Sequence, residues 1–588
     1  MRYMTKTFGA GVALAALLVA GCGEKAGDND AAKGPVADRV IVGATIYTVD
    51  GDNRVVDAMA VREGKILYVG DRAGAQAYVG DGTQVDALDG KVIFPGFTDT
   101  HAHVASGGEE LNGLSLTGVG SVEEVIAKVK AYADAHPELD FIVGRGWDLT
   151  LFPGANPSKD LLDAIVPDRP VYLEGADGHN GWANSKAFEA AGITKDTPDP
   201  AKGSFARLPD GTPSGALREE ANGAITALLP APTKEGVIAD IRRGMAFQNM
   251  QGMTAMVDAS VTDSVYNEAF LDLAKDPALP LRMKLSFLPG KTWEESFTTL
   301  ETVDEHVAAV VKRREDFRKV NAGRVDGDGI KIFVDGVAEN FTAAVIEPYV
   351  NIPDGHDHHG VMNLAPEALT AFVTGVDKEG FNVLFHSLGD QAVRSALDAV
   401  ENAEKVNGPR DRRHHLSHLE FVDPADIPRF KELGAVANLQ TLWHYADTYI
   451  TDLTLPHIKE DRQRWIYPAK SFKDAGVKLS WGSDWPVSTS DPFDSIEVAV
   501  TRQDPHDATS TPFIPEEALT VDDMIRALTI NGAWIMGQDA VRGSLEEGKL
   551  ADYIVVTADP YKVAPADISE IEVLETVVEG ATVYTKAN

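Results

Sequence analysis

Two histidines separated by one residue, His101 and His103, follow a short apolar run that begins after Pro95 and Gly96. On an extended strand, residues i and i+2 point to the same side, so both imidazoles can face one point at the strand's end. Neutral imidazole is a common ligand of zinc and related divalent metals. A solvated surface pair would show the same spacing. The interpretation as a metal site therefore depends on what lies at the ends of later strands.

Four more residues of suitable type stand at or near the ends of later strand-like runs: Lys331, His386, His418 and Asp484. With the His-x-His pair they make up four imidazoles, one group able to bridge and one carboxylate. This composition is that of a hydrolase site for two divalent metals, which keep a shared hydroxide deprotonated near neutral pH. In such a site Asp484 would accept the proton of the hydroxide and later deliver it to the leaving nitrogen.

The elements that would position these residues alternate between strands and helices. This alternation predicts parallel βαβ units, and eight units make a (β/α)8 TIM barrel of the α/β class, whose functional groups lie at the carboxyl ends of the strands. Helical patterns cover, for example, Leu364–Glu379 and Gln391–Val406. The expected strands are Phe97–His101, Thr254–Asp258, Arg282–Phe287, Gly329–Asp335, Asn382–His386, Arg413–Leu419, Ala435–Gln440 and Lys478–Asp484.

Both chain ends are rich in short strands and turn residues. Residues 39–95 and 541–588 are each too short to bury a core alone, so we expect them to form one small β-sandwich domain together. The barrel then covers 96–540. The segment of about 104–229 is too long for one crossover, and we expect an inserted subdomain over the barrel mouth.

The insertion contributes further candidate site residues. His179 is expected to be catalytic, holding the carbonyl oxygen of the substrate, although a structural loop histidine is the alternative. Trp147 and Asn184 are expected to bind the substrate. With Trp182 and Glu174 they would form one wall of a closed, partly apolar pocket with few polar anchors.

Five motifs identify a resemblance that covers about Val40–Tyr584. The chain resembles the amidohydrolase superfamily, and within it the YtcJ-like branch, amidohydrolase family 3. The resemblance implies metal-dependent hydrolysis of amide-like C–N bonds, including those of N-substituted formamides and N-acyl compounds. It also implies two divalent ions, with zinc expected, and carboxylation of Lys331 by CO₂. The matching motifs are Phe94–His103, Asp328–Gly336, Gly482–Val487, Gly178–Ser185 and Gly543–Asp552.

The chain departs from the family at one ligand, because Ser417 precedes His418 where the family usually has Glu-His. Strand alternation would place His414, four residues before His418, on the same face and deeper in the barrel as a partner of the ligands. Lys331 has two alternatives: an unmodified lysine at a one-metal site, or a buried structural lysine paired with Asp335.

Other functions stay open at this stage. A deaminase of the same superfamily would usually use one metal without the bridging lysine. A catalytically silent lipoprotein that binds small molecules need not keep a complete hydrolytic set. The sequence does not decide whether the chain forms a homodimer.

The N-terminal sequence predicts the cellular location of the protein. Arg2 and Lys6 precede the apolar run Ala10–Ala20, which ends at Gly21 and Cys22, the only cysteine. This pattern predicts a bacterial lipoprotein signal over 1–22, acylation of Cys22 and a flexible tether over 23–38. The protein would then face the periplasm, held at the cell envelope by its lipid anchor only. An ordinary secretory signal with an incidental cysteine is the alternative.

Composition excludes one class of partner. The chain has 588 residues, of which 44% are hydrophobic, and its formal net charge is −36. A nucleic-acid-binding protein needs a basic patch, so we expect no nucleic-acid partner. A small molecule with an amide-like bond is the expected substrate.

Overall fold

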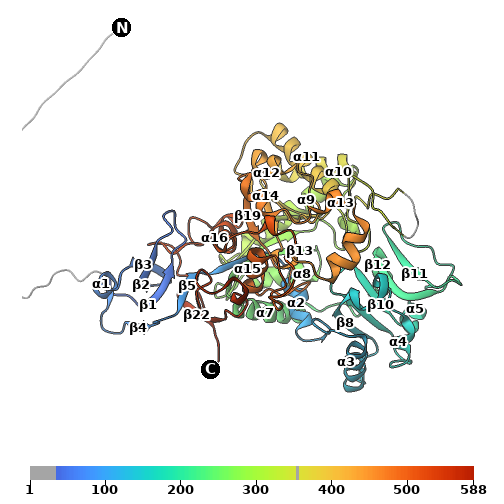
Figure 1. Ribbon diagram of the computed structural model, residues 1–588, viewed down its shortest axis with the longest axis horizontal. Coiled ribbons are helices and arrows are strands. Elements are labelled where there is room, and N and C mark those ends of the chain that lie inside the picture. The colour runs from blue at the N-terminus through green and yellow to red at the C-terminus, as the bar shows by residue number, and fades with distance from the viewer. Residues whose placement is uncertain (1–34, 353–356, 588) are drawn as a thin grey trace, which may run out of the picture.

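The structure is a computed structural model, and it describes residues 35–352 and 357–587. The expected signal 1–22, with Cys22, and residues 23–34 of the expected tether lie outside the described residues. Three β-sheets are present in the described chain. Figure 1 shows the sheet of the chain ends on the left, the barrel in the middle and the inserted sheet on the right.

The central sheet is the predicted parallel barrel. Its strand order is β19-β18-β17-β16-β15-β14-β13-β6, and all its pairings are parallel. The hydroxyl of Thr100 in β6 donates to the carbonyl of Trp481 in β19 at 2.6 Å, so the barrel is nearly closed. The strands are β6 (Phe97–Ala102), β13 (Met253–Val261), β14 (Arg282–Phe287), β15 (Val325–Phe333), β16 (Asn382–Ser387), β17 (His415–His418), β18 (Val436–Leu439) and β19 (Lys478–Trp481).

Amphipathic helices cover the barrel, as the sequence predicts. In α10 (Pro366–Lys378) the buried residues Leu369, Phe372, Val373 and Val376 recur at helical spacing, which makes one apolar face. The same core includes helices α7 (Lys234–Met250), α8 (Val265–Leu273), α9 (Val303–Val320), α11 (Asp390–Asn407), α12 (Ile427–Leu433), α14 (Ala469–Asp474) and α15 (Pro492–Thr501).

Both chain ends build one continuous eight-stranded sheet, so they share one β domain, formed by a single sheet where two stacked sheets of a β-sandwich were expected. Its order is β22-β21-β20-β5-β1-β2-β3, with β4 paired to β1, and β5 and β20 join the two ends antiparallel. Ile93 and Val555, which face each other across this join, are buried in one core. The strands are β1 (Arg39–Tyr47), β2 (Val55–Arg62), β3 (Lys65–Gly70), β4 (Gln84–Ala87), β5 (Val92–Pro95), β20 (Tyr553–Val556), β21 (Val573–Val578) and β22 (Ala581–Thr585).

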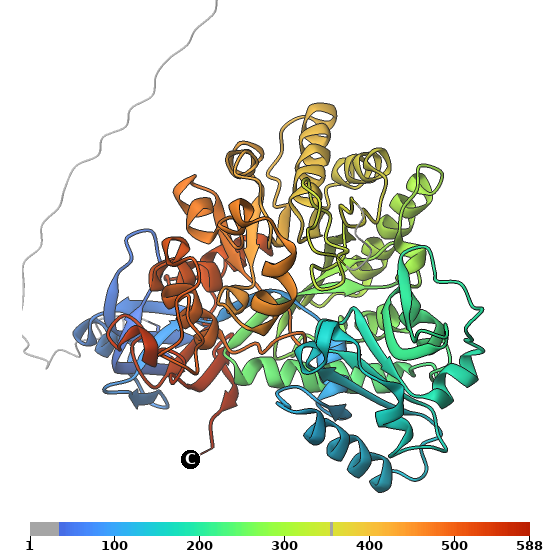
Figure 2. The same ribbon diagram turned by 45° about the vertical axis from the view of Figure 1, so that its right-hand side comes forward.

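The insertion forms a six-stranded sheet with its own hydrophobic core. Figure 2 shows it as a separate lobe beside the barrel. Helix α2 (Val104–Glu110), which leads into it, packs on α7, and a Cβ at Gly108 would lie 1.8 Å from the carbonyl of Asp240. Glycine therefore permits this close approach. The sheet order is β11 (Gly203–Arg207), β12 (Pro213–Glu219), β10 (Asn180–Ala183), β9 (Val171–Gly175), β8 (Ile142–Trp147) and β7 (Leu114–Ser115).

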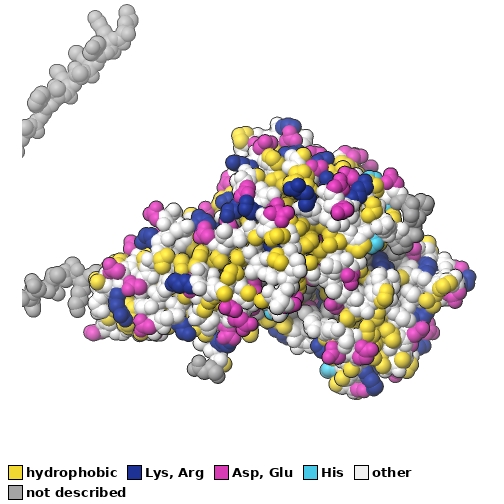
Figure 3. All heavy atoms as spheres, viewed as in Figure 1, with side chains coloured by type: hydrophobic (Ala, Val, Ile, Leu, Met, Phe, Trp, Pro, Cys, Tyr) yellow, Lys and Arg dark blue, Asp and Glu magenta, His cyan; other side chains and the backbone are white. Residues whose placement is uncertain are grey.

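The surface agrees with the composition. On the face drawn in Figure 3, acidic side chains are interleaved with basic ones, and no continuous basic patch is seen there. Among residues 35–352 and 357–587, no helix combines the length and the apolar character needed to cross a bilayer.

Candidate active site

A cavity of about 350 Å³ lies at the carboxyl end of the barrel, between the strands and the insertion. All six predicted metal ligands line it, although they come from five different strands or the loops that follow them. The structure therefore brings together the predicted constellation, while the role of each residue stays a prediction. The six are His101, His103, Lys331, His386, His418 and Asp484.

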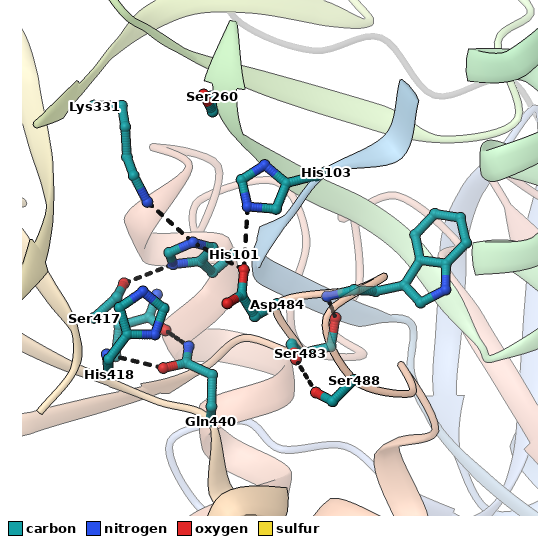
Figure 4. A network of polar contacts seen from close by, with 12 residues as sticks. His101, His103, Ser260, Lys331, Ser417, His418, Gln440, Ser483, Asp484 and Ser488 are labelled. Carbon is teal, nitrogen blue, oxygen red and sulfur yellow. Dashed lines mark hydrogen bonds and ion pairs between the residues drawn. The ribbon is translucent and has the colours of Figure 1, made fainter. Parts of the chain in front are cut away.

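His101, His103 and Asp484 form the tightest group. The Oδ1 atom of Asp484 lies 3.1 Å from Nε2 of His103 and 3.3 Å from Nε2 of His101. One possible ligand atom from each of the three residues lies within 4.8 Å of the others. Figure 4 shows both rings turned toward this carboxylate. The group has the composition of a metal site with nitrogen and oxygen ligands.

The buried carboxylate of Asp99 fixes the two chain segments that carry this group. Its Oδ1 accepts hydrogen bonds from the backbone N–H groups of His101 (3.0 Å) and Ser483 (3.1 Å), and its Oδ2 accepts one from the Ser483 hydroxyl. Asp484 itself has a positive φ of 58° and donates its backbone N–H to the His101 carbonyl at 2.7 Å. The carboxylate is thereby aimed back at the His-x-His strand.

His418 reaches the cavity by a route that strand alternation does not predict. In β17 the side chain of Ser417 faces the barrel interior, where its Oγ lies 2.8 Å from Nδ1 of His101. His418 has a φ of 78°, and Gln440 accepts its backbone N–H at 2.9 Å. The left-handed backbone turns the ring into the site, where it stacks on Trp443 with centroids 5.4 Å apart.

The prediction that His414 supports the ligands is wrong for the same reason. His414 accepts a hydrogen bond from the backbone of Val383 at 2.9 Å, and its Nε2 lies 3.3 Å from Asp377. It therefore joins β17 to β16 and α10. Strand alternation counted back from His418 gives the wrong side for His414, because the positive φ of His418 turns its ring away from the side that a regular strand would give it.

Lys331 is buried beside His101, with 3.2 Å between its Nζ and Nε2 of the histidine. Burial lowers the pKa of Lys331 to about 7. The alternative pairing with Asp335 is not seen. The Asp335 carboxylate accepts backbone N–H groups of Ala344, Leu388 and Gly389 at 2.8–3.1 Å.

Three of the predicted ligand imidazoles, those of His101, His386 and His418, have a lowered pKa, which favours the neutral ring. Burial is the largest cause that lowers the pKa of His101 and His386 well below 6.5, followed by the charge of Lys331. For His418 burial is again first, followed by His386. A neutral ring can donate a lone pair to a metal, whereas a protonated ring cannot.

Besides Asp99 and Gln440, sequence reasoning missed other polar residues that position these groups. Asp335 Oδ1 lies 3.4 Å from Nδ1 of His386, which leaves the other ring nitrogen for the cavity. Asp258 accepts the backbone N–H of Val104, just after His103, at 3.1 Å. Both end expected strands, which is a signal that could have identified them; Ser417 beside His101 carries no comparable signal.

His179 lies at the cavity, as predicted, with a charged partner. Its Nδ1 lies 2.7 Å from Oε2 of Glu219, and its ring centroid lies 5.7 Å from that of His386. Burial alone would lower the pKa of His179, but the Glu219 carboxylate outweighs it and raises the pKa to about 9. The Glu219 carboxylate therefore favours the protonated form of the His179 ring.

The predicted substrate contacts of Trp147 and Asn184 are wrong. Trp147 is fully buried in the core of the insertion, where its indole N–H donates to the Leu173 carbonyl at 3.0 Å. Asn184 caps α5 (Ser185–Ala191), and its side-chain amide makes four hydrogen bonds to backbone groups of the insertion. Its hydrogen-bonding capacity is used inside the lobe. Trp182 is likewise buried there.

The wall that the insertion does provide is charged rather than partly apolar. Glu174 lines the cavity as expected, and its Oε2 lies 3.3 Å from Nη2 of Arg145. Asp177 and Glu219 add two more carboxylates. The expectation of a wall with few polar anchors is therefore wrong. The large aromatic side chains of the insertion, Trp147 and Trp182, are buried in its own core and do not line the cavity.

The fold and this site define a class: a parallel barrel with imidazoles, a lysine and a carboxylate at its carboxyl mouth is the arrangement of a metal-dependent hydrolase. The chain belongs to the amidohydrolase family, whose model, described as "Amidohydrolase family", matches residues 84–584. Family membership supports metal-dependent hydrolysis as the general activity.

Individual relatives confirm the resemblance over nearly the whole chain. The putative amidohydrolase YtcJ of Bacillus subtilis (strain 168) is 29% identical, over 93% of this chain and 99% of that protein. The N-substituted formamide deformylase of Arthrobacter pascens is 28% identical, over 93% and 98%. The crystal structure of an uncharacterized metal-dependent hydrolase from Pyrococcus furiosus matches with a TM-score of 0.66 and 25% identity, over 89% of this chain and 100% of that one.

Proposed function

We propose that this protein is a metal-dependent amidohydrolase that cleaves an amide-like C–N bond of a small molecule, such as an N-acyl or N-formyl amine. The observation that carries this proposal is the convergence of four histidines, one lysine and one carboxylate on a single cavity. The deformylase relative acts, by its name, on N-substituted formamides, which supports the same class of bond here.

The side chains fit a pair of divalent metal ions, for which zinc is the expected choice. Both ring nitrogens of His418 are buried and have no hydrogen-bond partner among the described residues, a costly state that a bound metal would relieve. His101, His103 and Asp484 would hold one ion, and His386 and His418 would hold the other. Bound metals would polarise the substrate carbonyl and lower the pKa of a water molecule.

We further propose that Lys331 carries CO₂ as a carbamate. The neutral amine attacks the carbon of CO₂, a new N–C bond forms, and one amine proton leaves to solvent. The product is an anion with two oxygen atoms that can ligate metal. Support comes from the burial of Lys331 and from its lowered pKa of about 7, which make the neutral amine available. An intact-protein mass greater by one CO₂, lost on acidification, tests this step.

Two side chains would then move or hold protons at the reacting bond. Burial alone would raise the pKa of Asp484, but His103 outweighs it and keeps the group ionised. The carboxylate can accept a proton from the attacking water and return it to the leaving nitrogen. The His179 imidazolium can donate a hydrogen bond to the carbonyl oxygen as negative charge develops there.

Metal content and turnover measured together test the proposal. Elemental analysis should find up to two divalent ions per chain, and a chelator should abolish hydrolysis of the N-acyl amines and formamides in a substrate screen. His101→Ala should lose metal and activity together. His136→Ala, at an exposed histidine of the insertion that pairs with Glu138, is the matched control and should keep both. Ammonia release from amino-substituted rings, without amide hydrolysis, would instead favour a deaminase.

We also propose that the protein is held at the bacterial envelope by acylation of Cys22 and faces the periplasm. The pattern Leu18-Val19-Ala20-Gly21-Cys22 after an apolar run supports this. Cys22→Ser should abolish incorporation of labelled fatty acid and release the protein from the membrane fraction. Unchanged fractionation would overturn the lipid anchor.

A further inference from the structure

A second cavity, of about 300 Å³, borders the same reaction centre. It shares eight wall residues with the first cavity, and four of them carry ionisable groups at the reaction centre: His179, His386, His418 and Asp484. The other four are Gly146, Ala176, Asp177 and Val487. A molecule that is cleaved at the shared wall can therefore extend into both cavities. We call this second cavity the acidic chamber, because the carboxylates of Glu339, Glu420 and Asp447 line it.

The acidic chamber is built mainly by segments that follow barrel strands. The segment after β15 supplies Glu339, the segment after β17 supplies Glu420, and the segment after β18 supplies Asp447. Among the described residues that line the chamber there is no lysine and no arginine, and none of these three carboxylates takes part in a described ion pair with one.

Glu420 and Glu339 each present an unused acceptor. Glu420 is only 3% exposed; its Oε1 accepts a hydrogen bond from Thr454 at 3.2 Å, and its Oε2 accepts none from the described residues. Oε2 of Glu339 is also buried without a partner in the described chain. The described residues thus leave acceptor capacity on both carboxylates unused, which points to a ligand that brings donors.

The positive charge that His179 brings to the chamber wall is paired with Glu219, so Glu339, Glu420 and Asp447 have no ion-pair partner among the described residues. Burial, followed by the charge of Asp177, raises the pKa of Glu339 to about 7. Burial also raises the pKa of Asp447, to about 6. A cation placed among these groups would offset the cost of keeping them ionised.

The remaining walls favour an organic cation over a small inorganic one. Four aromatic rings line the chamber, and aromatic faces attract ammonium and guanidinium groups. A bare metal ion would instead require several oxygen ligands at short range around one point. The four rings are those of Trp443, Tyr445, Tyr449 and Tyr467.

We propose that the acidic chamber binds a positively charged ammonium or guanidinium group of the substrate, so that the hydrolysed amide belongs to a molecule with a second, basic nitrogen. This inference rests on the proposed amidohydrolase function, because it names the substrate class for that site. Glu339 and Glu420 accept the N–H donors of the cation, and the aromatic rings enclose its alkyl stem.

Binding can be tested without any hydrolysis. Butylguanidinium and butylurea have nearly the same shape, but only the first is charged. Calorimetry on the metal-loaded full chain should show butylguanidinium binding about tenfold to a hundredfold more tightly, as expected for hydrogen bonds to charged groups. Glu339→Gln and Glu420→Gln should each reduce this preference to within about threefold of unity. Glu189→Gln, at an exposed pair with Lys186 on the insertion, is the control and should keep it.

Hydrolysis tests the substrate class. The kcat/KM for N-acetyl-1,4-diaminobutane should exceed that for N-acetylpentylamine by about tenfold or more, and Glu339→Gln should remove the difference. Equal rates in the wild type would overturn the inference and leave the proposed function standing. Selective binding of butylguanidinium without hydrolysis of either amide would support the chamber and count against the proposed function. Failure of both binding and hydrolysis would overturn both.

Discussion

The substitution Glu219→Gln tests whether His179 acts as a cation. In the structure Glu219 Oε2 lies 2.7 Å from Nδ1 of His179, and this carboxylate raises the pKa of His179 to about 9. Glutamine keeps the shape and an acceptor oxygen but removes the negative charge. Burial then opposes only the weaker charges of Asp177 and Glu339, and we expect the pKa of His179 to fall from about 9 toward its ordinary value of 6.5.

The magnitude follows from this pKa change. A fall from about 9 to 6.5 corresponds to about 3 kcal/mol in the stability of the protonated ring. A neutral ring that donates Nδ1–H to residue 219 presents a lone pair at Nε2, so it offers no donor to the carbonyl oxygen. Loss of one such donor typically lowers turnover by about 10²–10³-fold. We expect that loss in kcat at about pH 8, where the wild-type ring is still protonated.

A pH–rate profile separates this role from a structural one. The imidazolium is present below its folded pKa, so wild-type kcat should fall as the pH rises through about 9. In Glu219→Gln the same fall in kcat should occur at a lower pH, below about pH 7. Metal content should be unchanged. Thr342→Val is the matched control, because it removes only a neutral hydroxyl that donates to Glu219 Oε1 at 2.6 Å. In Thr342→Val the fall in kcat should still occur near pH 9. A Glu219→Gln profile that matches the wild type would refute the charged role of His179.

Three further predictions follow from the structure. Asp484→Asn should lower kcat by about 10²–10⁴-fold, as for loss of a general acid–base group, and reduce metal content in elemental analysis; full turnover would exclude Asp484 as the proton carrier. Asp377→Asn should destabilise the fold by about 3–5 kcal/mol in denaturant unfolding, since it leaves the buried Arg412 unpaired. Burial alone would raise the pKa of Asp377, but His414 and Arg412 hold it well below 3.8, so its stabilisation is present above that pH and is lost as the pH falls further. A chain lacking 551–588 should be insoluble or melt at a lower temperature, and an unchanged melting curve would show that the shared sheet is not needed.

The sequence predicts the barrel and its ligand positions because both depend on local pattern and strand count. Each expected strand forms a true strand, and the carboxyl ends of parallel strands must meet at one mouth. His101, Lys331 and His386 could be placed for that reason alone. β15 begins at Val325, four residues before the expected Gly329, because Val325 and Asp326 pair with Met283 and Lys284 of β14. The register then shifts across Gly327 and Asp328, whose low strand propensity hides this extension in the sequence.

What the sequence could not provide depends on backbone exceptions and on tertiary packing. No local pattern predicts the positive φ of His418, which reverses the face on which His414 was expected. Tryptophan is a residue type that often lines pockets, yet Trp147 is buried because the insertion needs large apolar side chains for its own core. The acidic chamber is also invisible in sequence, since Glu339, Glu420 and Asp447 lie in three separate loops.

The antiparallel join between β5 and β20 has a consequence for biosynthesis. Val92 pairs with Val556, so a ribosome must complete nearly the whole chain before β5 gains this neighbour. Until then the growing polypeptide carries a short apolar strand with open hydrogen-bonding groups, a template for pairing with other chains. Contacts of such large sequence separation also form slowly. Production of this protein should therefore depend on chaperones that bind the first part of the chain until its last residues emerge from the ribosome.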